Sequence, residues 1–287
     1  MPLGAQGPRE KFRLGRVIGN AAAFLRRNAI FSIAAGTLFF ALPLALINLS
    51  TRYWPTLAFH LGAIGSGPWP MSVNLGFSMA SGLIGAVPNL VGQAVLSKAA
   101  AGEINGNRPS VASCVQTALQ HIFPVLGIGY TIYLVVFVAR SGSAAVELSY
   151  SPQAGGLVFL LLIVPCIVWG VAISVAVPVS VEEGLGTVAS MSRSRDLTKG
   201  YRWWIFGLIS VVVIGLLLGL RLATELGLTF VSLQSLSPLA IVLLTFQGAM
   251  VSAIIWTVLS IILATTYAEL RQVKEGPGAD ELAEIFS

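Results

Sequence analysis

Six long runs of apolar residues, separated by short polar segments, dominate the pattern of this chain. They cover residues 29–49, 73–96, 121–139, 156–178, 202–222 and 239–266. A helix rises 1.5 Å per residue, so about 20 apolar residues cross a hydrocarbon core of about 30 Å. The runs are continuous and do not alternate as the strands of a membrane β-barrel do. We therefore predict an all-α polytopic membrane protein with six transmembrane helices.

The runs divide the chain into a leader at 1–28, a transmembrane domain at 29–268 and a tail at 269–287. Pro178 is expected to end the fourth helix, because proline donates no backbone hydrogen bond and clashes with the preceding turn. Gly276, followed by Pro277, is expected to end the last helix.

Each pair of apolar runs follows a segment with helical spacing and weaker hydrophobicity. These segments begin at Phe12, Pro109 and Gly186. Two of them share nearly the same four-residue sequence, Ser110-Val-Ala-Ser and Thr187-Val-Ala-Ser. Ser110 and Thr187 both suit a helix N-cap. We predict three hairpin repeats, each preceded by a basic amphipathic helix lying in the membrane plane. The alternative is that any protein of alternating topology has basic inner loops.

The distribution of charge predicts the orientation of the chain. Only 10% of the residues are charged, and the net charge is +5. Fourteen of the 17 Lys and Arg residues lie on the side of the termini, whereas Arg52, Arg140 and Arg221 lie on the other side. Cytoplasmic loops carry the Lys and Arg excess, so we expect both termini in the cytoplasm. This placement accounts for the positive charge without a nucleic-acid partner.

Two sets of charged residues flank the inner ends of the runs. The candidates for binding anionic lipid headgroups are Arg16, Arg26, Arg27, Arg193, Arg195, Lys199 and Arg202. Glutamates recur where each hairpin returns, at Glu103, Glu182, Glu183 and Glu269. Juxtamembrane cations attract anionic lipid. We expect Glu182 and Glu183 to form ion pairs with Arg193 or Arg195 in preference to a proton or cation site.

Small and polar residues form stripes on two runs. In the second run Ser78, Gly82, Gly85, Asn89 and Gln93 share one helix face. They predict either a polar groove for a solute or lipid headgroup, or close packing with Asn and Gln bonding across helices, and we favour packing. In the sixth run Ala249, Ala253, Thr257, Ser260 and Ala264 form a similar stripe, for which packing is favoured more strongly.

Motifs for catalysis and metal binding are missing from the sequence. The two histidines, His60 and His121, lie far apart, and the two cysteines, Cys114 and Cys166, lie at different expected membrane depths. There is no HExxH, no GxxxxGK[ST] and no GxSxG. We therefore expect no enzyme activity, no cofactor and no metal, with an unrecognised membrane enzyme as the least favoured alternative.

Two passages resemble a bacterial membrane protein family. One is Pro178-Val-Ser-Val-Glu-Glu-Gly with Ser192-Arg-Ser-Arg-Asp-Leu-Thr-Lys-Gly-Tyr-Arg-Trp-Trp, and the other is Tyr267-Ala-Glu-Leu-Arg-Gln-Val-Lys-Glu-Gly. They are similar to motifs of the glycerophosphoryl diester phosphodiesterase membrane domain and of the YciC-like uncharacterised proteins. This resemblance implies a six-span body in the bacterial cytoplasmic membrane. It also implies that any phosphodiesterase activity belongs to a separate soluble domain, which we expect this chain to lack.

Two functions follow as expectations. The first is a non-catalytic scaffold or accessory subunit that interacts with anionic membrane lipids and with other membrane proteins or itself. The second is a transporter or permease for a small molecule or lipid, using the stripe of Ser78, Asn89 and Gln93.

Overall fold

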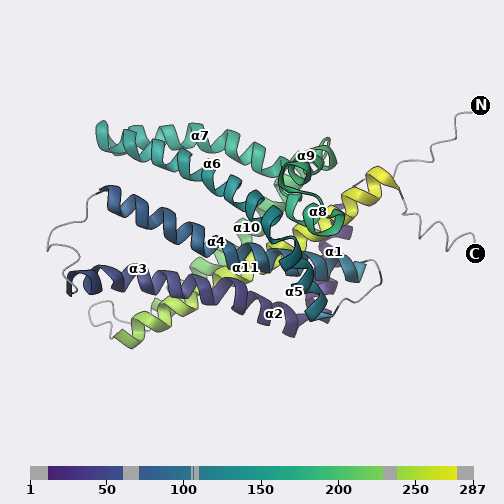
Figure 1. The fold of residues 1–287 in the computed structure, drawn as a ribbon, viewed down its shortest axis with the longest axis horizontal. Helices are drawn as coiled ribbons and strands as arrows, with labels where there is room; N and C mark the ends of the chain where they lie inside the picture. Colours follow the sequence, from purple (N-terminus) through teal and green to yellow (C-terminus); the bar gives the residue numbers. More distant parts are fainter. Residues whose placement is uncertain (1–11, 61–70, 105, 107–109, 229–237, 277–287) are drawn as a thin grey trace, which may run out of the picture.

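The described part of the chain consists of helices joined by short turns (Figure 1). The computed structural model describes residues 12–60, 71–104, 106, 110–228 and 238–276. Its elements are α1 (Leu14–Arg27), α2 (Ala29–Gly36), the π-helical turn η1 (Thr37–Ala41), α3 (Leu42–His60), α4 (Met71–Ile104), α5 (Val111–Gln120), α6 (Ile122–Ser149), α7 (Pro152–Ala172), α8 (Ala176–Glu183), α9 (Thr187–Thr198), α10 (Arg202–Leu228) and α11 (Pro238–Glu275). Within these residues, six segments are long and apolar enough to cross a membrane. The predicted all-α polytopic membrane protein is confirmed.

A short helix precedes a long hairpin three times along the chain. Helix α1 precedes the hairpin of α2, α3 and α4; α5 precedes that of α6, α7 and α8; and α9 precedes that of α10 and α11. Helices α1, α5, α8 and α9 gather at one end of the molecule, hereafter the capped end, away from the α6–α7 turn (Figure 1). The order of elements is the one expected from the sequence, and the internal repeat itself stays a prediction.

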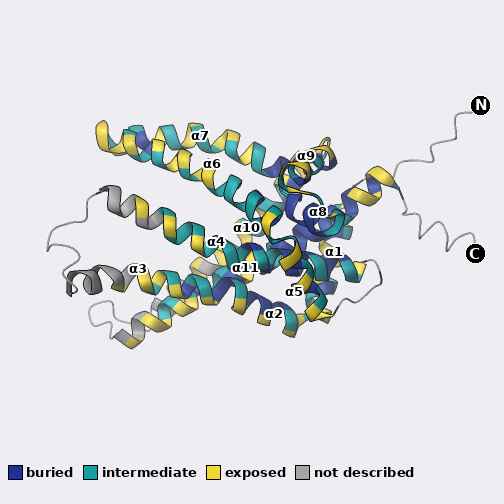
Figure 2. Ribbon diagram, in the orientation of Figure 1, coloured by how far each residue is buried: buried dark blue, intermediate teal, exposed yellow. Residues whose placement is uncertain are grey.

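Helix α11 is the centre of the packing. It contacts α1, α2, η1, α3, α4, α8, α9 and α10. Half of its most apolar window is buried, compared with 11–33% in the other five spans. The predicted small-residue stripe of α11 is buried in these contacts, at Ala249, Ala253, Thr257, Ser260 and Ala264. Packing is therefore the role of this stripe, and burial rises towards the capped end (Figure 2).

The fourth span is broken earlier than predicted. Helix α7 ends at Ala172, and α8 begins at Ala176 and continues through Pro178 to Glu183. The prediction that Pro178 ends this span is therefore wrong. Pro178 lies in the first turn of α8, where backbone N–H groups have no acceptor within the helix, so the missing N–H of proline costs no helical hydrogen bond. The break frees the carbonyl of Ala172, which accepts hydrogen bonds from Ser194 Oγ and Thr198 Oγ1, each at 3.1 Å. Helix α9 thus closes the break.

The three short helices differ in the surface that they bury. Helix α1 buries Val17, Ala21 and Phe24, and α5 buries Cys114 and Ala118. Helix α9 instead buries Ser190, Ser194, Leu197 and Thr198, so three of its four buried residues carry hydroxyls. Helix α5 contains no Lys or Arg. The expected basic amphipathic helix is present in α1. It is wrong for α5, which is not basic, and for α9, whose buried face is mainly polar and not apolar.

The two predicted N-caps have different outcomes. Ser110 caps α5, because its side chain accepts a hydrogen bond from the Ser113 N–H at 3.2 Å. The residue before α9 is Gly186, and Thr187 lies inside the helix, where its hydroxyl donates to Pro124 O at 3.2 Å. Thr187 therefore joins α9 to α6 and is not a cap. Gly276 follows α11 with a φ of 80°, as predicted for a helix end.

Candidate functional site at the capped end

All four inner-end glutamates form ion pairs with cations from other helices. The pairs are Glu103 with Arg27 at 3.3 Å, Glu182 with Lys98 at 3.2 Å, Glu183 with Arg193 at 3.1 Å and Glu269 with Arg16 at 3.0 Å. They join α1 to α4, α4 to α8, α8 to α9, and α1 to α11. These charged residues connect the first short helix to the last span, although more than 250 residues separate the two.

Glu269 is the most buried of these acids. Its side chain is 4% exposed, and its Oε1 accepts hydrogen bonds from the Arg13 N–H and Arg16 Nε, both at 3.1 Å. Arg16 remains 32% exposed. A buried carboxylate is tolerated only when paired and hydrogen-bonded. The Arg16 guanidinium supplies the ion pair and a hydrogen bond, and the Arg13 backbone N–H supplies a second hydrogen bond. Together they hold the start of α1 against α11.

Glu183 lies where the two passages of the family resemblance meet. Its carboxylate accepts hydrogen bonds from Arg193 Nε at 3.1 Å and from the Tyr267 hydroxyl at 3.0 Å. Arg193 also pairs with Glu275 at the end of α11. The predicted pairing of Glu183 with Arg193 is present, whereas Glu182 pairs with Lys98 of α4 instead. Sequence spacing could not indicate Lys98 or Tyr267, because both lie more than 80 residues away from their partners.

A small hollow lies beside Glu103. Its volume is about 110 Å³, it is partly open to the surface, and it is lined by Phe24, Asn28, Phe31, Ala99, Glu103, Val111 and Cys114. Asn28 Nδ2 donates a hydrogen bond to Glu103, so the carboxylate has a neutral donor in addition to Arg27. Burial raises the pKa of the Cys114 thiol, while nearby Lys98 acts in the opposite direction. The thiol is therefore neutral at pH 7.

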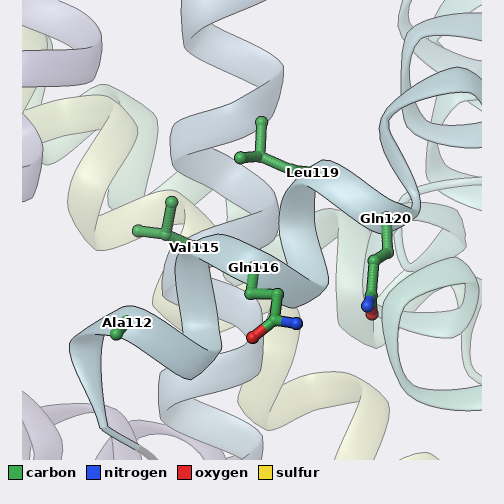
Figure 3. A pocket seen from close by; sticks show the side chains of 5 residues that line it. All are labelled: Ala112, Val115, Gln116, Leu119 and Gln120. Atoms are coloured by element: carbon green, nitrogen blue, oxygen red, sulfur yellow. The ribbon is translucent and has the colours of Figure 1, made fainter.

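A second, shallow hollow lies on the outer face of α5. Ala112, Val115, Gln116, Leu119 and Gln120 line it. Figure 3 shows Val115 and Leu119 pointing to one side of the helix, and Gln116 and Gln120 pointing to the other. Because a single helix lines this hollow, it is an open surface. Its apolar side suits contact with hydrocarbon, and its amide side suits water, as in a helix at a membrane interface.

The seven lipid-binding candidates fall into two groups in the structure. Arg16, Arg27 and Arg193 are paired with glutamates. Within the described part of the chain, no carboxylate pairs with the other four, which are Arg26, Arg195, Lys199 and Arg202. Partial neutralisation weakens the attraction of the first group for lipid phosphates, so the second group carries more of the predicted lipid binding.

The stripe on α4 is only partly explained by packing. Gly82 faces Tyr133 of α6 and Gly85 faces Ile47 of α3, and a Cβ at either position would lie 2.4 Å from the neighbouring side chain. Asn89 and Gln93 are half-buried and make no hydrogen bond with another described residue. The side chain of Ser78 is outside the described set. The glycines thus allow close packing, but the expected amide bonds across helices are missing.

No group of three or more His, Cys, Asp or Glu side chains in the described residues is arranged to hold a metal ion. A scan against protein-family models and searches of curated proteins and of solved structures each found no match. The family resemblance therefore stays a prediction.

Proposed function

We propose that this chain is a non-catalytic scaffold or accessory subunit of the bacterial cytoplasmic membrane. Both termini lie in the cytoplasm, and the protein binds anionic lipids and other membrane proteins or a second copy of itself. The observation that carries this proposal is the pairing of all four inner-end glutamates with cations of other helices. Intramembrane and interfacial acids in transporters and pumps exchange protons or ions. The acids in this protein hold helices together.

The sides of the hairpins support the binding of lipid or membrane partners. On α7, the large apolar residues Leu157, Leu160, Leu161, Val164 and Val168 are all more than half exposed. Only 17% of the most apolar window of this span is buried within the chain. In a membrane such a face is covered by lipid chains or by another transmembrane helix. A scaffold uses surfaces of this kind.

Native-membrane purification tests this proposal. The full chain, carrying an affinity tag, is extracted in a mild detergent after cross-linking, and its associated proteins and lipids are identified. We expect a stoichiometric membrane partner or a homo-oligomer, together with enrichment of anionic lipid that raised salt weakens. A bare monomer with no preference for lipid charge would contradict the proposal.

A transporter or permease is the second candidate, favoured by the amides of Asn89 and Gln93, which bond to no other residue in the described part of the chain. Unpaired polar groups in a membrane are costly and often line a solute path. The variant Asn89→Leu/Gln93→Leu tests this function in reconstituted vesicles. Gln116→Leu/Gln120→Leu, on the open face of α5, is the matched control. Loss of solute or lipid movement only in the first variant would favour transport, and unchanged movement and stability in both variants would reject the groove.

A further inference from the structure

Three of the unpaired cations lie together where α9 passes into α10. Arg195 and Lys199 are one helical turn apart, and Arg202 Nη2 lies 3.5 Å from the Arg195 carbonyl oxygen. Lys274, at the end of α11, donates a hydrogen bond to the Asp196 carbonyl and lies within electrostatic reach of the Asp196 carboxylate and of Lys199, Arg193 and Arg202, so the cations here outnumber the one acid. Like charges held together repel one another. An anion bound among them would remove this cost.

Arg202 has an unused donor at this position. Its Nε is buried and has no hydrogen-bond partner. The first helical hydrogen bond of α10 runs from the Ile205 N–H to the Tyr201 carbonyl at 3.0 Å, so the N–H groups of residues 202–204 precede the helical ladder. The N-terminus of a helix carries partial positive charge and favours phosphate. Arg202 is the first residue of α10, so its guanidinium and these backbone donors belong to the same helix start.

Two exposed tryptophans place the cluster at a membrane surface. Trp203 is 82% exposed and Trp204 is 61% exposed, in the first turn of α10. The apolar span itself begins at Arg202. Tryptophan is enriched where lipid headgroups meet the hydrocarbon. An anion bound by Arg195, Lys199 and Arg202 thus lies at the depth of lipid phosphates, with the indole rings beside the start of the acyl chains.

We propose that the turn between α9 and α10 binds the phosphate of an anionic phospholipid through Arg195, Lys199, Arg202 and the N-terminus of α10. This inference rests on the proposed function and adds a defined lipid site to it. Arg26 is also unpaired within the described residues, but it lies at the C-terminal end of α1, whereas the start of α1 approaches this turn through the Phe12–Tyr201 contact. The cluster therefore retains individual lipid molecules, whereas isolated cations contribute only general surface attraction.

Native mass spectrometry of the full chain in detergent tests the site, with phosphatidylglycerol and phosphatidylcholine as probes. In Arg195→Gln/Lys199→Gln/Arg202→Gln we expect phosphatidylglycerol retention to fall about tenfold or more, since several surface cations each add to lipid attraction. The control Arg26→Gln/Arg140→Gln/Arg271→Gln removes the same charge at positions outside this turn, and it should retain wild-type binding within about twofold. Size-exclusion profiles and melting curves verify that each variant folds. The single variant Arg195→Gln, at an exposed position, provides a milder test.

Each outcome decides the inference. Equal losses in the two triple variants, or no loss in either, would overturn the site while leaving general anionic-lipid binding intact. A wild-type protein without preference for phosphatidylglycerol would overturn both the site and the lipid part of the proposed function. Displacement of the lipid by millimolar inorganic phosphate would show that the ligand is a free anion. A several-fold gain of binding on removing residues 277–287 would show that the acidic tail is the occupant.

Discussion

At the scale of single residues, the charged side chains of the capped end act mainly on one another. Glu269 and Glu183 accept hydrogen bonds from arginines of the short helices α1 and α9. The sequence indicated that acids and bases would meet at this end, and it correctly proposed Glu183 with Arg193. It could not identify the partner of Glu269 or of Glu182, because partners so distant in sequence are chosen by the packing of helices.

We predict that Glu269→Gln lowers the free energy of unfolding by about 1–3 kcal/mol, because it removes the charge that Arg16 and the Arg13 N–H bind. Arg16 can still reach water, which limits the loss. Arg271→Gln is the control, since the exposed pair of Arg271 with Glu275 contributes about 0.5 kcal/mol or less. Thermal melting in one detergent compares the two variants, and equal shifts would contradict the assigned role of Glu269.

A second prediction concerns Cys114, whose pKa is raised by burial. The folded protein then keeps its thiol proton at a pH where the unfolded chain releases it. The stabilising effect is complete below the ordinary thiol pKa of about 8.5 and is lost as the pH rises above it. Stability of the wild type should therefore fall more steeply between pH 7 and pH 10 than that of Cys114→Ala. Parallel pH profiles of melting temperature would disprove this assignment.

At the scale of elements, close approach at glycine shapes the first hairpin. A Cβ at Gly92 of α4 would lie 2.5 Å from Phe39 Cβ and 3.1 Å from Phe40 Cζ, both in the π-helical turn η1. The apolar runs predicted the spans, but not the additional helical length of α4, α6 and α11. These helices continue to polar ends because residues such as Glu103 and Glu275 find ion-pair partners there.

We expect Gly92→Ala to destabilise the protein, since Phe39 Cβ is attached directly to the backbone of η1 and cannot move aside alone. An overpacked position typically costs about 1–3 kcal/mol. Gly170→Ala in α7 is the matched control, because nothing lies within 4 Å of its Cβ. There alanine should be neutral or stabilising by up to about 1 kcal/mol. Melting temperatures measured in the same detergent would refute the assigned contact if Gly92→Ala were as stable as the control.

At the scale of the whole molecule, the capped end unites the three units. The ion pairs of the four inner-end glutamates and the bonds from α9 to Ala172 lie there, while the hairpin sides remain apolar and exposed. A protein built in this way has a stable polar end and hairpins whose surfaces are available to lipid or partners.

We predict that the capped end faces the cytoplasm, as the excess of Lys and Arg at that side requires. A fluorescent protein fused after Ser287 should be bright, and a phosphatase that folds only outside the cytoplasm should be active when inserted within residues 61–70. An inactive phosphatase there, with an active one after Ser287, would reverse the orientation. Insertion at Gly106 serves as a second cytoplasmic control.

The sequence by itself determined the fold class, the six spans and the order of short helix and hairpin, because continuous apolar runs and helical spacing are local properties of the chain. Only the tertiary structure decided which cations are paired with glutamates and which remain available to bind an anion. Arg16, Arg27 and Arg193 resemble Arg195, Lys199 and Arg202 in the sequence, yet helix packing brings glutamates to the first three alone. The same packing stabilises the break after Ala172, because the Ser194 and Thr198 hydroxyls of α9 donate hydrogen bonds to the carbonyl that the break frees.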